Sequence, residues 1–336
     1  MLKELCLLNG TSGREKAVRD YIIEHIPSDC KYTVDRLGNV IAEKKGKNPA
    51  KNKVMLSAHM DEVGFIITYI TDEGFLKFAN VGGIDERVIF GRSVTVGDRN
   101  IHGVIASKAV HQLSKEEANK LPCVDDMYID IGAKDRKDAE KYVSLGDTAY
   151  FNSDYLEFGD GFVKAKALDD RMGCAILLEI INSEVEYDLT VCFVTQEEIG
   201  TRGAAVAAYN VKPDYAVVVE GTTASDISDT PDSKKVCKLG EGAVVSYMDR
   251  GTVYDFELYG KAMQVAQSNG IKCQTKTVVA GGNDAAAIHK SGAGVKTIAV
   301  SVPTRYIHSP SCVAKLEDIQ SVKQLVISLA GEFAND

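Results

Sequence analysis

Tryptophan is absent from this 336-residue sequence, and none of its eight cysteines forms a Cys-x-x-Cys pair. Most of the cysteines lie inside apolar segments, which favours free thiols in a reducing compartment. A zinc site built from thiolates and a catalytic cysteine are the alternatives. No internal repeat or low-complexity tract is present, so neither a solenoid nor a disordered tail is predicted.

Long apolar runs and clusters of basic residues are also missing. No segment approaches the roughly 18 apolar residues that a membrane helix needs, and the apolar stretch at the N-terminus is too short for a signal peptide. The net charge is -9, and the basic residues are scattered singly, which provides no surface for nucleic acid or an anionic membrane. We therefore expect a cytoplasmic protein without nucleic-acid or membrane partners.

What is present is a folded soluble chain, 45% hydrophobic, in which apolar strands alternate with helices on both sides of a β-rich block. Ser12 and Glu15 have capping-box spacing at the start of one helix. The expected helices are 2–8, 13–25, 168–182, 203–209 and 316–333. The expected strands are 35–45, 53–58, 189–196, 215–220 and 296–303. This alternation predicts an α/β fold with a mixed, mostly parallel sheet and helices on both of its faces.

The β-rich block consists of short strand-like pieces separated by turn signals, which favours a small β-barrel or sandwich. The expected strands are 65–70, 75–79, 88–90, 93–96, 101–107, 127–132 and 147–151, with one helix at 137–143. We interpret the block as an inserted small β-barrel domain. The predicted boundaries are 1–64 and 159–336 for the discontinuous α/β domain and 65–158 for the insertion.

Metal-ligand side chains recur where apolar strands end. These residues are His59, Glu197, Glu198, Glu220 and His308, and Asp169 opens a helix. In an open α/β sheet the carboxyl ends of the strands form the ligand-binding edge, so residues far apart in sequence are expected to converge there. Two histidines with several carboxylates suit zinc, cobalt or manganese.

Three details of these segments have a physical interpretation. Asp61 lies two residues after His59, on the same side of an extended chain, where it can orient the imidazole. The two oxygens of Asp169 could bridge two cations, whereas Asp170 could be an acid favoured by the helix dipole. Because side chains alternate along a strand, Glu197 and Glu198 can share one site only if the strand breaks there.

Five motifs in order, SAHMDEVG, ALDDRMG, TQEEIGTRGA, VVEGTTASD and PTRYIHSP, resemble those of the glutamyl aminopeptidases, or tetrahedral (TET) aminopeptidases. The resemblance covers nearly the whole chain and implies a zinc-peptidase-like fold. The position of the β-rich block, before Asp169, is typical of this family. A related carboxypeptidase and deacylase family carries its insertion later, after the position of Glu220.

The resemblance implies two divalent metal ions per subunit, zinc or cobalt with manganese as a further possibility. His59, Asp169 and Glu220 would hold one ion, and Asp169, Glu198 and His308 the other. Glu197 would be the general base acting on a metal-bridging water, with Asp61 assigned to the catalytic set. A cis peptide bond between Asp169 and Asp170 is also implied.

The position of Glu220 is more often aspartate in the family. Glutamate is one methylene longer, so an alternative is that Glu220 is a surface acid and that Asp226 or Asp229 is the ligand. The segment that begins at Gly281 resembles one that lies beside the substrate in the family.

That segment makes Gly282, Asn283 and Asp284 candidate substrate-binding residues, although Asn283 could instead cap a helix. The segment lacks the Lys-Ser/Thr of a nucleotide-binding loop, which argues against a phosphate site. Arg305 could bind a substrate carboxylate or pair with an acid of the chain.

The predicted function is a dinuclear aminopeptidase that removes N-terminal residues from short peptides. By resemblance, the inserted domain makes dimers that assemble into a hollow tetrahedral dodecamer, and it controls substrate access. The rival hypotheses are a metal-stabilised binding or assembly protein and a glycosidase with paired carboxylates. The preferred N-terminal residue, whether acidic, aliphatic or basic, is left open.

Overall fold

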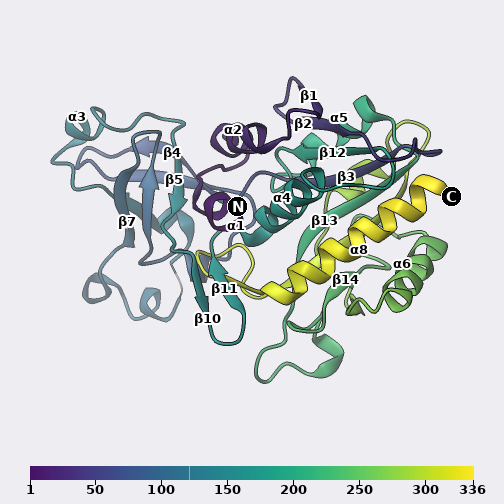
Figure 1. Ribbon diagram of the computed structural model, residues 1–336. Coiled ribbons are helices and arrows are strands. Elements are labelled where there is room, and N and C mark those ends of the chain that lie inside the picture. Colours follow the sequence, from purple (N-terminus) through teal and green to yellow (C-terminus); the bar gives the residue numbers. More distant parts are fainter. Residues whose placement is uncertain (121) are drawn as a thin grey trace.

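The computed structural model describes residues 1–120 and 122–336, and its largest element is an eight-stranded mixed sheet (Figure 1). The strand order is β1-β2-β12-β3-β13-β16-β14-β15. The strands are β1 (Lys31–Val34), β2 (Val40–Lys44), β3 (Val54–His59), β12 (Leu189–Val194), β13 (Tyr215–Thr223), β14 (Ala243–Val245), β15 (Cys273–Thr275) and β16 (Lys296–Thr304). The four central strands β12, β3, β13 and β16 are parallel, and antiparallel pairs flank them.

Helices cover both faces of this sheet, because successive side chains of a strand point to opposite faces and both sets are apolar. In β3, Leu56 belongs to one core cluster and Met55 to the other. Helices α1 (Leu2–Leu7), α2 (Lys16–His25), α4 (Leu168–Ile181), α6 (Phe256–Ser268) and α8 (Leu316–Asn335) supply the first cluster, and α5 (Arg202–Val211) and α7 (Ala285–Ile288) supply the second. Within the described residues, no helix is both long enough and apolar enough to cross a bilayer.

A closed barrel stands beside the sheet and has its own core (Figure 1). Its strands are β4 (Gly64–Ile70), β5 (Leu76–Val81), β6 (Ser93–Val96), β7 (Ile101–Ser107), β8 (Met127–Asp130) and β9 (Thr148–Phe151), in the order β4-β5-β8-β7-β6-β9. Phe65 packs edge-on against Phe78 and Phe151, with ring centroids 5.0 and 5.1 Å apart. A small sheet of β10 (Leu156–Phe158), β11 (Phe162–Ala165) and β17 (Cys312–Lys315) follows.

The predicted fold class, a mixed α/β sheet with an inserted barrel, is confirmed. Several local predictions are wrong. The expected strand 88–90 overlaps the 3-10 helix Glu86–Val88, which Asp85 caps, and the helix expected at 137–143 is the single turn α3 (Arg136–Ala139). Further 3-10 helices are Val110–Gln112, Glu117–Asn119, Val124–Asp126 and Asp232–Lys234. The edge strand β1 is absent from the sequence prediction, and all four of its residues are exposed.

Candidate metal centre

The metal-ligand residues predicted from sequence meet at the carboxyl edge of the four parallel strands. His59 is the last residue of β3, and Glu220 lies within β13. Glu197 and Glu198 follow the end of β12, and His308 follows β16. Asp169 lies in the first turn of α4, which packs against β3 and β13.

Asp169 lies between two histidines and presents one carboxylate oxygen to each. Its Oδ1 is 3.6 Å from Nε2 of His59, and its Oδ2 is 3.6 Å from Nε2 of His308. A second acid accompanies each histidine, with Glu220 Oε1 3.1 Å from Nε2 of His59 and Glu198 Oε2 3.2 Å from Nε2 of His308. The geometry therefore consists of two adjacent donor sets that share Asp169.

These donors fit divalent cations. Within the described chain, Nε2 of His59 and Oε2 of Glu220 are buried without a hydrogen-bond partner, which is costly unless a ligand completes them. One ligand atom from each of His59, Asp169 and Glu198 lies within 4.8 Å of the others. Imidazole nitrogens with carboxylate oxygens are the donors that zinc and related ions prefer.

Asp170 also comes close to His59 and Glu220, but its oxygens are already used by the backbone. They accept hydrogen bonds from the amides of His59, at 3.2 Å, and Gly173, at 3.0 Å. A Cβ atom at position 173 would lie 2.3 Å from the carboxylate, so glycine is needed there. Asp170 therefore links the end of β3 to the first turns of α4 through hydrogen bonds. The peptide bond between Asp169 and Asp170 is cis, as the resemblance implies.

The concentration of buried acids shifts the protonation of the cluster. Burial is the main cause that raises the pKa of Glu198 to about 7, and it raises the pKa values of Glu197 and Glu220 well above their usual range. Burial alone would lower the pKa of His308, but Asp169 and Glu198 raise it to about 9. Positive charge is therefore favoured throughout this cluster.

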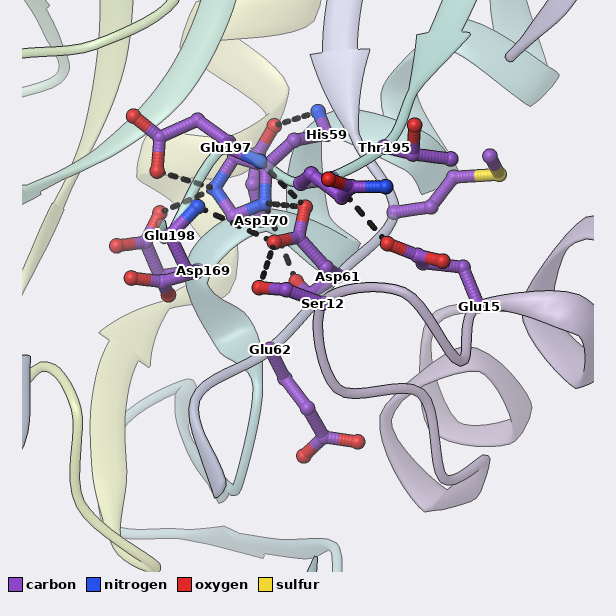
Figure 2. Close-up of polar contacts among 12 residues, drawn as sticks. Ser12, Glu15, His59, Asp61, Glu62, Asp169, Asp170, Thr195, Glu197 and Glu198 are labelled. Atoms are coloured by element: carbon purple, nitrogen blue, oxygen red, sulfur yellow. Dashed lines mark hydrogen bonds and ion pairs between the residues drawn. The ribbon is translucent and has the colours of Figure 1, made fainter. Parts of the chain in front are cut away.

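The β12 strand breaks before the two glutamates, as the shared site requires. The strand ends at Val194, and Gln196 has a φ of 57°, in the left-handed region. The amides of Glu197 and Glu198 then donate to Oδ1 and Oδ2 of Asp61, at 3.0 and 3.1 Å (Figure 2). Asp61 thus holds the turn that brings both glutamates to one site.

Asp61 is completely buried, and it also contacts His59 and Ser12. Its backbone carbonyl is 3.1 Å from Nδ1 of His59, and its carboxylate Oδ1 is 3.4 Å from the same nitrogen. The Ser12 hydroxyl donates to Oδ2 at 2.6 Å (Figure 2). Although burial raises the pKa of Asp61, these hydrogen bonds lower it below its usual value.

The sequence predicts that Ser12 caps the following helix, and this prediction is wrong. The helix α2 begins at Lys16 with Glu15 at its N-cap position, and Ser12 is bound to Asp61 instead. No local signal could reveal this contact, because 49 positions separate the two residues.

The two adjacent glutamates have different environments. Glu198 is 4% exposed and its carboxylate contacts His308, whereas Glu197 is 14% exposed and its Oε2 is 4.0 Å from Nε2 of His59. Among the described residues, the Glu197 carboxylate accepts no hydrogen bond from a neighbour. It is the more accessible and less engaged of the pair.

The remaining predicted residues are distributed differently. The Arg305 guanidinium makes two hydrogen bonds with Asp226, at 2.7 and 2.8 Å, which is the pairing with an acid considered from sequence. Asp226 is thereby engaged away from the cluster, and Asp229 is exposed, so the structure favours Glu220 over both alternatives. Gly282 lines a small cavity that reaches Asp169.

Asn283 and Asp284 follow Gly282. Asn283 accepts from the amide of Ala285 and donates to Asp249 and Tyr254, so its side chain organises the loop. Asp284 is completely buried, and neither of its carboxylate oxygens has a partner among the described residues. Burial raises its pKa to about 7.

The sequence profile of the M42 glutamyl aminopeptidase family matches residues 38–325. This chain belongs to the M42 family. The membership agrees with the resemblance read from the five motifs, and it makes the protein a metallopeptidase, a metal-dependent enzyme that hydrolyses peptide bonds.

Relatives of this M42 chain match it along almost its whole length. A protein from Acetivibrio thermocellus, provisionally named an aminopeptidase, is 39% identical, and the match covers 97% of this chain and 96% of the relative. The lysyl aminopeptidase of Pyrococcus furiosus is 29% identical, covering 99% and 96%. The glutamyl aminopeptidase of Lactococcus lactis is also 29% identical, covering 94% and 91%.

Solved structures agree with the fold. An aminopeptidase from Desulfurococcus kamchatkensis is 32% identical with a TM-score of 0.93, covering 98% of this chain and 93% of the other. The TET1 peptidase of Pyrococcus horikoshii, described as assembling into a tetrahedron or an octahedral shell, is 35% identical with a TM-score of 0.86 and 98% coverage of both. A Thermotoga maritima structure described as an endoglucanase is 35% identical, with a TM-score of 0.82, covering 99% and 98%.

Proposed function

We propose that this M42 metallopeptidase is a dinuclear aminopeptidase that removes N-terminal residues from short peptides, with Glu197 as its general base. The observation that carries the proposal is the position of Asp169 between His59 and His308, with one carboxylate oxygen toward each. A carboxylate in that position can serve two neighbouring cations at once.

The residues assigned to the ions follow from the two donor sets. His59, Asp169 and Glu220 would hold one, and Asp169, Glu198 and His308 the other, with zinc or cobalt as the ions and manganese as a further possibility. When bound, such ions polarise the carbonyl of the scissile bond and make water a stronger acid. The longer side chain of Glu220 already reaches His59, at 3.1 Å.

Glu197 is proposed to move the proton. As the less engaged of the two glutamates, it can take a proton from the attacking water and deliver it to the amine that leaves. Burial and the neighbouring acids Asp284 and Glu198 raise the pKa of Glu197, which suits a group that must both accept and release a proton.

Asp61 positions both parts of this machinery. It contacts His59 and holds the amides of Glu197 and Glu198, so one carboxylate sets the direction of a ligand and of the base. Ser12 fixes Asp61 in turn.

An aminopeptidase must also recognise the free N-terminus of its substrate. We assign the negative charge that attracts the ammonium group to the cluster with Asp284, whose buried oxygens have no partner in the described part of the chain. Gly282 forms a wall of the adjoining cavity, and Asn283 shapes the loop. Arg305 receives no substrate contact here, because its guanidinium is bound to Asp226.

We propose that the protein acts in the cytoplasm as a homo-oligomer. The segment 65–158, treated as one domain, would form dimers that assemble into a tetrahedral dodecamer. This proposal is supported by the description of the Pyrococcus horikoshii TET1 peptidase. Light scattering of the intact protein tests the proposed assembly, because it distinguishes a dimer from a dodecamer.

The catalytic test is Glu197→Gln, measured on aminoacyl chromogenic substrates in parallel with metal analysis. Removing the base should lower kcat by about 10²- to 10⁴-fold while two ions per subunit are retained. Glu184→Gln, an exposed substitution of the same kind, is the control and should change neither quantity. Retained activity in the Glu197 variant would reject the assigned base, and cellulose hydrolysis that persists with a chelator would favour a glycosidase.

A further inference from the structure

Lys276 is a buried cation that the proposed mechanism does not use. It follows β15, where its amide bonds to the carbonyl of Val245, and only 6% of the residue is exposed. Its ammonium donates one hydrogen bond, to the carbonyl of Ala280 at 2.7 Å. An ammonium group carries three donors, so this contact leaves most of its hydrogen-bonding capacity unused.

No carboxylate of the described residues forms an ion pair with Lys276 within 4.0 Å. The acid with the largest electrostatic effect on it is Asp249, but the oxygens of that residue are occupied. They accept hydrogen bonds from the amides of Gly251 and Thr252, the hydroxyl of Tyr254 and the side chain of Asn283. Burial lowers the pKa of Lys276, as expected for a cation without a partner acid.

Lys276 lines the cavity that adjoins the candidate metal centre. Asp169 and His308 form one part of its wall, and the loop at Gly281 and Gly282 forms another. The cavity measures about 120 Å³, the space of about four water molecules at ~30 Å³ each. Such a volume suits one small side chain and is too small for a folded partner.

We propose that this cavity receives the side chain of the substrate's N-terminal residue and that Lys276 selects an acidic one, glutamate or aspartate. This inference rests on the proposed aminopeptidase function, because the reacting peptide bond must lie at Asp169 and His308. The carboxylate of the substrate supplies the partner that Lys276 lacks. The two relatives named above as lysyl and glutamyl aminopeptidases show that family membership alone does not determine this preference.

The same geometry explains which substrates are disfavoured. A lysine or arginine side chain would place a second cation beside Lys276 in a space with little water, where like charges repel strongly. Leucine would leave the ammonium as poorly partnered as before. Glutamine has nearly the shape of glutamate without its charge, so the ratio of the two substrates isolates the contribution of the charge.

The test compares the p-nitroanilides of glutamate, glutamine, leucine and lysine on the intact, metal-loaded protein. We expect kcat/KM for glutamate to exceed that for glutamine by about 10- to 100-fold, the range for a buried charged hydrogen bond. Lys276→Met should remove this preference, so that the kcat/KM for glutamate falls to that for glutamine. Lys276→Arg, which keeps the charge, should retain part of it.

Lys272→Met is the matched control, since Lys272 lies four residues earlier in the same segment and is exposed. It should leave the glutamate-to-glutamine ratio unchanged. A purely structural Lys276 would lower activity on all substrates alike in Lys276→Met, together with the melting temperature. A preference for glutamine, leucine or lysine in the wild type, or a glutamate preference that survives Lys276→Met, would overturn the proposal.

A binding measurement separates this proposal from the catalytic one. Calorimetry with free L-glutamate and L-glutamine needs no turnover. Tighter binding of glutamate, lost in Lys276→Met, supports the pocket even if no anilide is cleaved, in which case the aminopeptidase function alone fails. Equal binding of both amino acids by a wild type that cleaves no anilide rejects the pocket as well.

Discussion

Two clusters of buried charge lie on either side of the HMDE segment, and they differ in how completely they are neutralised. One contains Glu62, Lys166 and Arg171, and the other is the candidate metal centre. Glu62 turns its carboxylate away from His59, as Figure 2 shows, and binds the Lys166 ammonium at 2.7 and 2.8 Å. The Arg171 guanidinium lies 3.4 Å from the same carboxylate.

The buried charges of the Glu62 cluster are neutralised and hydrogen-bonded by protein groups alone. Arg171 also donates to the carbonyls of Met60, Leu5 and Leu8, and Lys166 donates to Leu8. The metal-centre cluster instead joins several acids to two histidines and leaves buried atoms of His59 and Glu220 without partners in the described residues. Buried charge that the chain neutralises is structural, whereas buried charge that it leaves incomplete indicates a ligand.

Among the variants that change the two clusters, Asp169→Asn is expected to have the largest effect. Both donor sets lose a shared charge, so we expect fewer than two ions per subunit and a fall in kcat/KM of at least about 10³-fold, or about 4 kcal/mol. Metal analysis and peptidase assays measure the two quantities. Asp160→Asn, at an exposed carboxylate, is the control. Full metal content in Asp169→Asn would contradict the shared-ligand assignment.

Changes in the Glu62 cluster should lower the stability of the folded protein. Glu62→Gln leaves Lys166 and Arg171 buried without their acid, and we expect the free energy of unfolding to fall by about 3 to 5 kcal/mol. Metal stoichiometry should stay at the wild-type value. Denaturant unfolding is the measurement, and the double variant Glu62→Gln with Lys166→Met should recover part of the loss. Unchanged stability in the single variant would show that this cluster is dispensable.

Metal loading should also distinguish the two clusters, through its effect on the melting temperature. Ions at 100 times their dissociation constant should stabilise the folded protein by about 2.7 kcal/mol per independent site, seen as a rise in melting temperature. The rise should survive in Glu62→Gln and be reduced in Asp169→Asn. An equal rise in both variants would place the ions elsewhere.

The smallest effect expected is that of Ser12→Ala. It removes the hydroxyl that donates to Asp61. Losing this hydrogen bond to a buried charged acceptor should lower the free energy of unfolding by about 1 to 3 kcal/mol. We expect kcat to fall by up to about tenfold with metal content unchanged. Ser233→Ala, at an exposed position of the 3-10 helix Asp232–Lys234, is the control. Wild-type kcat in Ser12→Ala would show that Asp61 needs no help in holding the two glutamates.

Much of the site follows from sequence because its residues share a position relative to secondary structure. Four of the segments end parallel strands of one sheet, and strand ends of this kind meet at one edge. Glu62 shows the limit of such reasoning. It belongs to the same segment as His59, yet its carboxylate points to Lys166, which is 104 residues away.

Local errors have the same origin. The 3-10 helix Glu86–Val88 replaces an expected strand because a side-chain cap from Asp85 competes with the apolar pattern. Lys276 carried no signal in the sequence, since one lysine near a strand is ordinary until its surroundings are known.

The sequence by itself determined the α/β class, the inserted barrel, the metal-ligand residue types and the break that Glu197 and Glu198 require, because periodicity and strand-end position are local properties. Only the tertiary structure decided which buried charges are neutralised. Asp61 and Ser12, Glu62 and Lys166, and Lys276 with its single carbonyl partner differ through contacts made after folding. Whether a buried charge is neutralised depends on its distances to other atoms. Distances between segments that are far apart in the chain cannot be read from the sequence.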